Sequence, residues 1–325
     1  MQAAYIERLG GPDQIRVGTL PDPVAGPHDV LVRAEAMAVN HVDRFVRSGA
    51  YRTRVEFPFV IGRDVVGTVV ETGSRVTRFA AGERVWSNSL GYAGRQGSFS
   101  ELVAVPQDRA YHLPDGVDPP HAVSVLHTMG TAYLGLVREG GLTGGTVFIG
   151  GAGGGVGSAA VQLAVAQGAR VIASASPDDF DWVRSCGAQE VLDYHDDSLF
   201  GSLVECAPSG VDIYWDCSGH HDFEATVPVM AMRGRIIVAA GITSNNEVPT
   251  GALYTHDLSI RGFAISNASV HDLGLAAERI NAMLRGGKAR ARIGRDLPLA
   301  DAADAHRLLE SQSARALGGK VVIHP

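Results

Sequence analysis

A glycine-rich segment near the middle of the chain contains the residues whose types and spacing most plainly indicate chemistry. The apolar run Val147–Ile149 leads into Gly-Gly-Ala-Gly-Gly-Gly and then into a helical pattern, with the spacing Ala152-x-Gly154-x-x-Gly157. Glycine lets a backbone turn tightly and approach a ligand closely, because it has no Cβ. The first amides of the helix, at the positive end of its dipole, then point at an anion. The pattern predicts a pyrophosphate site for a dinucleotide; the alternative is a tight turn with only a structural role.

The strand that would follow this helix indicates which dinucleotide binds. NAD-specific sites usually end that strand with Asp or Glu, which accepts hydrogen bonds from the ribose hydroxyls. Here it ends in Ser174-Ala175-Ser176, and both serines can donate to a 2′-phosphate. Asp178 and Asp179 follow closely and carry the wrong charge for a phosphate. The sequence therefore predicts NADP(H), with a modest preference over NAD(H).

Later strand ends supply further candidate ligands, because ligands bind at the carboxyl ends of strands in open parallel sheets. Ser218 follows the predicted fourth strand, Gly241 the fifth and Phe263 the sixth, where backbone groups could contact a carboxamide. The predicted pyrophosphate cradle consists of Gly154, Gly155, Val156 and Gly157, with Ala152 at the first position of the fingerprint.

The segments around these residues predict an α/β protein of two domains. From about His121, helix-length segments such as Ser158–Gln167 and Phe223–Met232 alternate with apolar runs, which favours a doubly wound parallel sheet. The expected strands are Val147–Ile149, Val171–Ser174, Val191–Tyr194, Val211–Trp215, Ile236–Ala240 and Leu258–Ile260. The first 120 or so residues carry short β-branched runs instead, typical of a small β-domain: Val30–Arg33, Val65–Glu71, Arg84–Trp86 and Leu102–Val105. The tail should return to that domain, through helices near His271–Leu284 and Ala302–Glu310 and a strand at Lys320–His324.

Composition excludes several classes of protein. The net charge of −7 argues against a nucleic-acid partner. There is no apolar run of about 18 residues, which a membrane span needs, and no signal pattern at the N-terminus. Cys186, Cys206 and Cys217 are odd in number and lack CxxC spacing, so they predict free thiols in a reducing compartment, with the cytoplasm as the default.

Short motifs along nearly the whole chain resemble the medium-chain dehydrogenase/reductase superfamily, in particular its zinc-independent quinone oxidoreductase (ζ-crystallin-like) branch. Besides the glycine turn, the matching segments are residues 38–43 with 48–51, 58–67, 82–85, 97–101, 131–133 and 319–322. The resemblance implies a GroES-like catalytic domain (residues 1–121 and 265–325), a Rossmann cofactor domain (residues 122–264) and an active site in the cleft between them. It also implies a homodimer joined through the sheet edge at Leu258–Phe263.

The resemblance places Asn40, Asp43 and Tyr51 beside the active site. Asn40 could bind a substrate oxygen or the nicotinamide ribose, or it could be a loop amide that satisfies nearby backbone. Tyr51 could give a proton to a reduced oxygen, or it could be an aromatic wall. Asp43 could instead orient its loop. The resemblance also places Thr131 near the nicotinamide and Tyr194 beside the adenosine phosphate pocket.

Metal binding is not expected. Zinc-using members of the superfamily carry Cys where Asn40 stands and His where Arg63 stands, and an amide or a guanidinium is no substitute. Arg63 could pair internally with Asp64 or attract an anionic substrate; His127 is interpreted as an ordinary helix residue. The predicted function is zinc-independent, NAD(P)H-dependent reduction of quinones or α,β-unsaturated carbonyls. The alternatives are a zinc-type alcohol dehydrogenase and a non-catalytic NADPH-binding protein.

Overall fold

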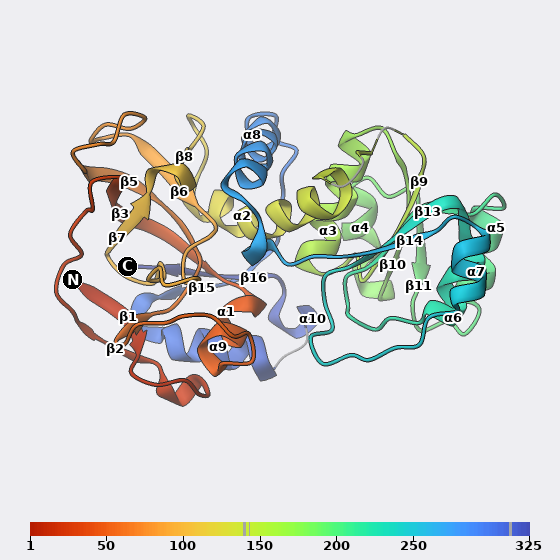
Figure 1. Cartoon of the computed structure of the whole chain (residues 1–325), viewed down its shortest axis with the longest axis horizontal. Coiled ribbons are helices and arrows are strands. Elements are labelled where there is room, and N and C mark those ends of the chain that lie inside the picture. Colours follow the sequence, from red (N-terminus) through yellow and green to blue (C-terminus); the bar gives the residue numbers. More distant parts are fainter. Residues whose placement is uncertain (139–140, 143, 312–313) are drawn as a thin grey trace. The chain divides into compact units, whose positions relative to one another are not determined.

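The computed structural model describes residues 1–138, 141–142, 144–311 and 314–325 of the chain, in two compact units. Unit 1 consists of Met1–Gly130 and Ala268–Pro325, and unit 2 of Thr131–Asn267. Both termini lie in unit 1 (Figure 1). The boundary expected after residue 121 falls inside helix α2 (Pro119–Tyr133), which continues from one unit into the other. The second boundary, expected after residue 264, lies at residue 267.

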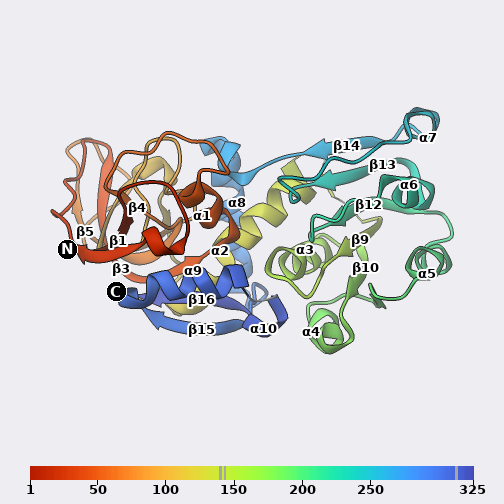
Figure 2. The same ribbon diagram turned by 90° about the horizontal axis from the view of Figure 1, so that it is seen from below.

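Unit 2 is built on the predicted doubly wound sheet. Its six strands are parallel and lie in the order β11-β10-β9-β12-β13-β14, and Figure 2 shows β14, β13, β12, β9 and β10 following one another. The strands are β9 (Thr146–Gly150), β10 (Arg170–Ala175), β11 (Glu190–Asp193), β12 (Val211–Asp216), β13 (Met230–Val238) and β14 (Ser259–Gly262). The helices are α3 (Gly155–Ala166), α4 (Phe180–Ser185), α5 (Leu199–Cys206), α6 (Phe223–Thr226) and α7 (Thr250–Thr255). The strand order reverses beside β9, so the glycine turn after β9 lies at the switch point of the sheet.

One predicted helix of this unit is wrong in its second half. Helix α6 ends at Thr226, a short 3₁₀ turn covers Val227–Val229, and β13 begins at Met230. Pro228 lacks the N–H that a longer helix needs, and its ring clashes with the preceding turn. Met230 instead pairs with Val211 of β12. Tertiary pairing thus converts the end of an apolar segment from helix to strand.

Unit 1 is the β-rich domain that the N-terminal runs predicted. One sheet has the order β2-β1-β4, and a second has the order β15-β16-β3-β5-β6-β8, with β7 paired to β3. The strands are β1 (Gln2–Ile6), β2 (Arg16–Thr19), β3 (Asp29–Val39), β4 (Phe59–Val60), β5 (Asp64–Thr72), β6 (Arg84–Ser87), β7 (Leu102–Pro106), β8 (Tyr111–His112), β15 (Ile293–Pro298) and β16 (Lys320–His324). The helices, besides α2, are α1 (His41–Ser48), α8 (Val270–Arg285), α9 (Ala302–Ser311) and α10 (Ala314–Leu317).

The C-terminal strand places one end of the chain beside residues from its beginning. Strand β16 pairs antiparallel with β3, so that Val321 lies opposite Val39. The side chains of Val321 and Ile323 belong to the core of this unit, together with Val39. This pairing brings Lys320, the first residue of β16, next to the loop that leads from β3 into α1.

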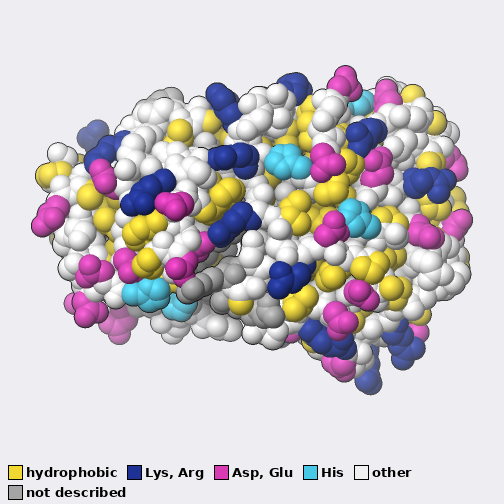
Figure 3. All heavy atoms as spheres, turned by 180° about the vertical axis from the view of Figure 1, so that it is seen from behind, with side chains coloured by type: hydrophobic (Ala, Val, Ile, Leu, Met, Phe, Trp, Pro, Cys, Tyr) yellow, Lys and Arg dark blue, Asp and Glu magenta, His cyan; other side chains and the backbone are white. Residues whose placement is uncertain are grey.

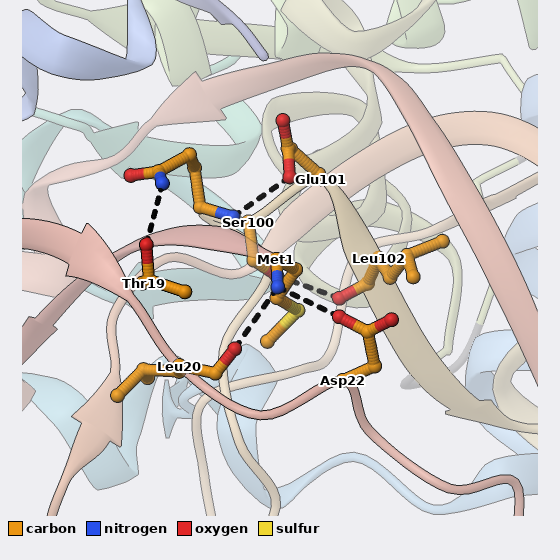
Figure 4. Close-up of polar contacts among 8 residues, drawn as sticks. Met1, Thr19, Leu20, Asp22, Ser100, Glu101 and Leu102 are labelled. Atoms are coloured by element: carbon orange, nitrogen blue, oxygen red, sulfur yellow. Dashed lines mark hydrogen bonds and ion pairs between the residues drawn. The ribbon is translucent and has the colours of Figure 1, made fainter.

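Polar contacts hold both the chain's start and helix α1 in place. The Met1 ammonium donates to the Leu20 carbonyl (2.9 Å) and to Asp22 (2.7 Å), as Figure 4 shows. Arg47, 2% exposed, donates from α1 to the Gly10 carbonyl (3.1 Å) and contacts His306 and Glu310 of α9. Helix α1 is therefore fixed by a buried cation at its C-terminal end.

Three further observations concern the surface, the helices and the cysteines. On the face drawn in Figure 3, acidic and basic side chains are interspersed. No helix among the described residues is long and apolar enough to cross a bilayer. The three cysteines are free thiols, as predicted.

Candidate active site

The glycine turn of unit 2 has the form that a pyrophosphate cradle needs. Strand β9 ends at Gly150, Gly151 has a positive φ of 67°, and α3 begins at Gly155. A Cβ on Gly157 would lie 2.4 Å from the Gly151 carbonyl oxygen and 2.7 Å from the Ala152 Cα. Only glycine lets the helix approach the turn this closely, so that the first amides of α3 are presented at the carboxyl edge of the sheet.

Two other predicted ligands lie at the same edge. A Cβ on Gly151 would lie 3.4 Å from the Ser218 amide nitrogen, so the loops after β9 and β12 touch. Ser244 joins the loops after β12 and β13, because its hydroxyl donates to the Gly219 carbonyl (3.2 Å) and its N–H to the Gly241 carbonyl (2.8 Å). The fold therefore gathers Ser218 and Gly241 near the cradle.

The residues expected beside the adenosine half occupy different environments. Ser174 and Ser176 are buried, and the Ser174 carbonyl accepts from the Ala152 N–H (2.8 Å). Tyr194 follows β11, is 49% exposed and has its ring against that of His195, with the planes tilted by 38°. Asp179 is closer to the cradle than its position in the sequence suggested: a Cβ on Gly153 would lie 2.3 Å from its Oδ2. A carboxylate at this place disfavours a 2′-phosphate and suits ribose hydroxyls.

Two residues expected near the nicotinamide also lie in unit 2. Thr131 is buried at the start of the unit. Phe263 follows β14, and its N–H donates to the Val238 carbonyl (3.1 Å). The N–H of Phe263 is thus already paired within unit 2.

Unit 1 holds a buried polar network around Asn40. The Lys320 ammonium donates to the Val39 carbonyl (3.0 Å) and to Asn40 Oδ1 (2.5 Å). Asn40 Nδ2 donates to Asp64 Oδ2 (3.0 Å), and the Asn40 N–H donates to Asp43 Oδ2 (2.8 Å). Both ends of the Asn40 amide are therefore engaged, with the oxygen toward a cation and the nitrogen toward a carboxylate. Whether Asn40 also binds substrate stays a prediction.

Burial dominates the protonation of this network. It raises the pKa of Asp43 to about 6, against the opposing effects of Arg63, the Asn40 N–H and Lys320. It raises the pKa of Asp64 to about 7 and lowers that of the Lys320 ammonium. The network consequently holds protons on its carboxyl groups at higher pH than free carboxyls would.

Arg63 lies within this network but does not form the direct pair with Asp64 that was one of its two predicted roles. In the described part of the chain, Arg63 Nε and Nη2 and Asp64 Oδ1 have no hydrogen-bond partner. Arg63 is 1% exposed, and its guanidinium carbon lies 5.6 Å from the centre of the Tyr92 ring. Tyr92 in turn stacks on Tyr51 (centroids 5.4 Å, planes 15° apart).

Sequence reasoning missed two members of this site, Lys320 and Tyr92. Lys320 is one of two lysines in the chain and stands directly before the apolar run of a predicted strand. A lysine at such a place indicates a buried cation, and a buried cation needs an acidic partner. Tyr92 lies in the loop between β6 and β7, and a loop has no periodic pattern from which the contacts of its side chains could be predicted.

Stability is expected to rise from about pH 4 to about pH 7 and then to level off. Burial lowers the pKa of His41 to about 4 and of His306 to about 3, and holds that of His127 well below its usual value. Between about pH 4 and 6 the unfolded chain thus binds three histidine protons that the folded chain lacks, whereas the folded chain keeps two protons on Asp43 and Asp64. The difference of one proton raises the free energy of unfolding by about 1.4 kcal/mol per pH unit.

Above about pH 6.5 the rise becomes shallower, because the unfolded histidines now lose their protons too, while folded Asp64 holds a proton up to about pH 7. Urea unfolding at a series of pH values measures the profile. The variant Asp64→Asn serves as the control and should make the rise between pH 4 and 6 steeper, because the folded chain then keeps one proton fewer. A stability that falls steadily from pH 4 to 6 would contradict the assignment.

The donor set does not suit a zinc ion. Among the described residues no three His, Cys, Asp or Glu side chains are grouped to hold a metal. Where zinc-using relatives are expected to have two ligands, this chain has Asn40, whose amide is engaged, and Arg63, which is a permanent cation. Arg63 and the neighbouring Lys320 ammonium would repel a divalent cation.

Comparisons with known proteins agree with this geometry. The family model described as alcohol dehydrogenase GroES-like domain matches residues 26–115, and the one described as zinc-binding dehydrogenase matches residues 155–282. A quinone oxidoreductase of Pseudomonas aeruginosa is 31% identical over 335 residues, covering 99% of this chain and 98% of that protein.

Several solved structures match the entire chain, among them the following two. One, described as an NAD-dependent alcohol dehydrogenase, is 31% identical, with a TM-score of 0.88 and 100% of both chains covered. The other, a mycobacterial protein complexed with NADPH, is 28% identical, with a TM-score of 0.84 and 100% of both chains covered.

Proposed function

The chain belongs to the quinone oxidoreductase branch of the medium-chain dehydrogenase/reductase family, with a GroES-like domain and a Rossmann domain, and on that premise we propose that it reduces quinones or α,β-unsaturated carbonyls with a nicotinamide cofactor and without zinc. The observation that carries the proposal is the glycine turn at the carboxyl edge of the unit 2 sheet, where only glycine fits at position 157. Its residues 154–157 would hold the cofactor's pyrophosphate, and the bound cofactor would supply hydride.

The chemistry of the donor set narrows the acceptor. Without a Lewis acid, an ordinary ketone or aldehyde has little to polarise its oxygen. Quinones and enones accept hydride with less help, because the charge spreads onto a remote oxygen. The tasks left to this chain are orientation, hydrogen bonding to that oxygen and delivery of one proton.

Oxidation of NADPH, followed by absorbance with a panel of quinones, enones and simple aldehydes, tests the proposal. We expect turnover with quinones or enones that EDTA leaves unchanged. A zinc-type alcohol dehydrogenase, the alternative that the match to an NAD-dependent alcohol dehydrogenase favours, would oxidise alcohols and lose activity with the chelator. A non-catalytic binding protein would bind NADPH and turn over none of the panel. Either outcome overturns the proposal.

Tyr51→Phe is expected to lower kcat by about 10 to 100-fold, the order expected when one positioned hydrogen bond or proton donor is lost. Binding of NADPH should be unchanged, because the cofactor cradle lies in the other unit. Steady-state kinetics and fluorescence titration with NADPH measure the two effects. If the variant equals the parent on every accepted substrate, Tyr51 is a wall residue.

We expect kcat/KM with NADPH to exceed that with NADH by about tenfold, or about 1.4 kcal/mol. Ser174 and Ser176 favour the 2′-phosphate and the nearby Asp179 carboxylate opposes it. Asp179→Ser should therefore widen the ratio further, whereas the exposed Asp181→Ser leaves it unchanged. An advantage for NADH in the parent would show that Asp179 dominates.

The proposal also includes assembly as a homodimer and a location in the cytoplasm. Strand β14 lies at the edge of its sheet, where a second copy could pair across a twofold axis to form a homodimer. The three free thiols suit the reducing cytoplasm.

A further inference from the structure

The loop between β6 and β7 brings a second phenol to Tyr51. The two rings are nearly parallel, and a side-chain hydrogen bond joins Tyr92 to Tyr51. Both side chains are half-buried and pack against the core of unit 1. A phenol that both stacks on a second phenol and hydrogen-bonds to it is restrained in position and in proton direction.

Arg63 places a buried positive charge beside this pair. Its guanidinium faces the Tyr92 ring, and its Nε and Nη2 have no hydrogen-bond partner in the described part of the chain. Asp43 and Asp64 offset part of its charge, although both carboxylates accept their hydrogen bonds from Asn40. Tyr51 and Tyr92 also interact electrostatically with Arg63, so its charge favours an anion at either tyrosine.

We propose that Tyr92 is a positioning residue for Tyr51, which holds the Tyr51 hydroxyl in place and returns a proton to it after each turnover. The proposal rests on the proposed function, in which Tyr51 protonates the reduced oxygen. The Tyr51 O–H bond breaks as the new O–H bond forms on the acceptor. Tyr51 then takes the proton of Tyr92, and Tyr92 regains one from water. Each turnover consumes one proton from solvent, together with the hydride that the cofactor supplies.

The charges around Tyr92 agree with this role. Burial and the hydrogen bond with Tyr51 raise the pKa of Tyr92, whereas Arg63 and Arg95 act in the opposite direction. Arg95 is itself held by the Ser89 carbonyl (3.2 Å). Tyr92 is thus protonated at neutral pH, as a proton donor must be. The charges of Arg63 and Arg95 would stabilise the tyrosinate that forms when Tyr92 gives up its proton.

Tyr92→Phe tests the proposal, because phenylalanine keeps the stacked ring and removes the hydroxyl. We expect kcat with one good quinone to fall about tenfold with KM nearly unchanged. The double variant Tyr51→Phe/Tyr92→Phe should be no slower than Tyr51→Phe alone, because both hydroxyls serve one proton path. Tyr5→Phe, a half-buried tyrosine of β1 outside the network, is the matched control.

A second readout needs no turnover. The ultraviolet absorbance of tyrosinate, compared between parent and Tyr92→Phe, gives the pKa of Tyr92. That pKa should fall in the Tyr51→Phe background, since the hydrogen bond that raises it is removed. Parent-like kcat in Tyr92→Phe, strictly additive losses in the double variant or an unmoved pKa would each overturn the proposal alone. No NADPH oxidation by the parent would instead overturn the proposed function, and this proposal with it.

Discussion

Gly157→Leu is expected to weaken NADPH binding by at least about 100-fold, equivalent to about 2.8 kcal/mol. The added Cβ would meet backbone, the Gly151 carbonyl oxygen at 2.4 Å and the Ala152 Cα at 2.7 Å, which cannot swing aside as a side chain can. Helix α3 must then move away from the turn after β9. The amides of the cradle lose their common direction toward the pyrophosphate as a result.

Fluorescence titration with NADPH measures the loss, with circular dichroism to confirm that the variant is folded. Gly157→Ala should show a smaller loss in the same direction, which keeps the test decisive if the leucine variant does not fold. Gly201→Ala, in helix α5 of the same unit, is the matched control: no atom lies within 4 Å of the added Cβ. It should leave binding unchanged and stabilise the helix by up to about 1 kcal/mol. Unweakened binding by Gly157→Ala and Gly157→Leu would place the cofactor elsewhere.

Lys320→Met is expected to lower the free energy of unfolding at pH 8 by about 3 kcal/mol or more, the cost of leaving a buried charge without its partner. The ammonium donates to Val39 and Asn40 and offsets the charges of Asp64 and Asp43. At pH 5 the loss should be smaller, because the pKa of Asp64 near 7 lets that group take up a proton and remove its charge.

Urea unfolding at the two pH values measures this difference. Lys288→Met is the matched control, since Lys288 is exposed after helix α8, and it should change stability by less than about 0.5 kcal/mol. Lys320→Arg should retain part of the stability because it keeps the charge. A loss below about 1 kcal/mol for Lys320→Met at pH 8 would show that Asp64 does not depend on the ammonium.

Local patterns along the chain were sufficient to predict the elements that we propose bind the cofactor. Strand β9, the glycine turn and α3 are consecutive in sequence, so the spacing of Gly154 and Gly157 carries their geometry directly. The apolar runs likewise predicted every strand of the unit 2 sheet to within a few residues, except that β13 begins at Met230 rather than Ile236. The β-rich character of unit 1 followed from its short β-branched runs.

The tertiary structure alone decided the polar site of unit 1. Lys320 lies 280 residues from Asn40, and only the antiparallel pairing of β16 with β3 brings its ammonium to that amide. Tyr92 reaches Tyr51 through a loop whose path no periodicity records. Sequence predicts contacts between neighbours along a helix, strand or turn, because their spacing is fixed by backbone geometry. Contacts between distant segments depend on how the strands pair and how the core packs. The charges that surround Arg63 could therefore be identified only from the tertiary structure.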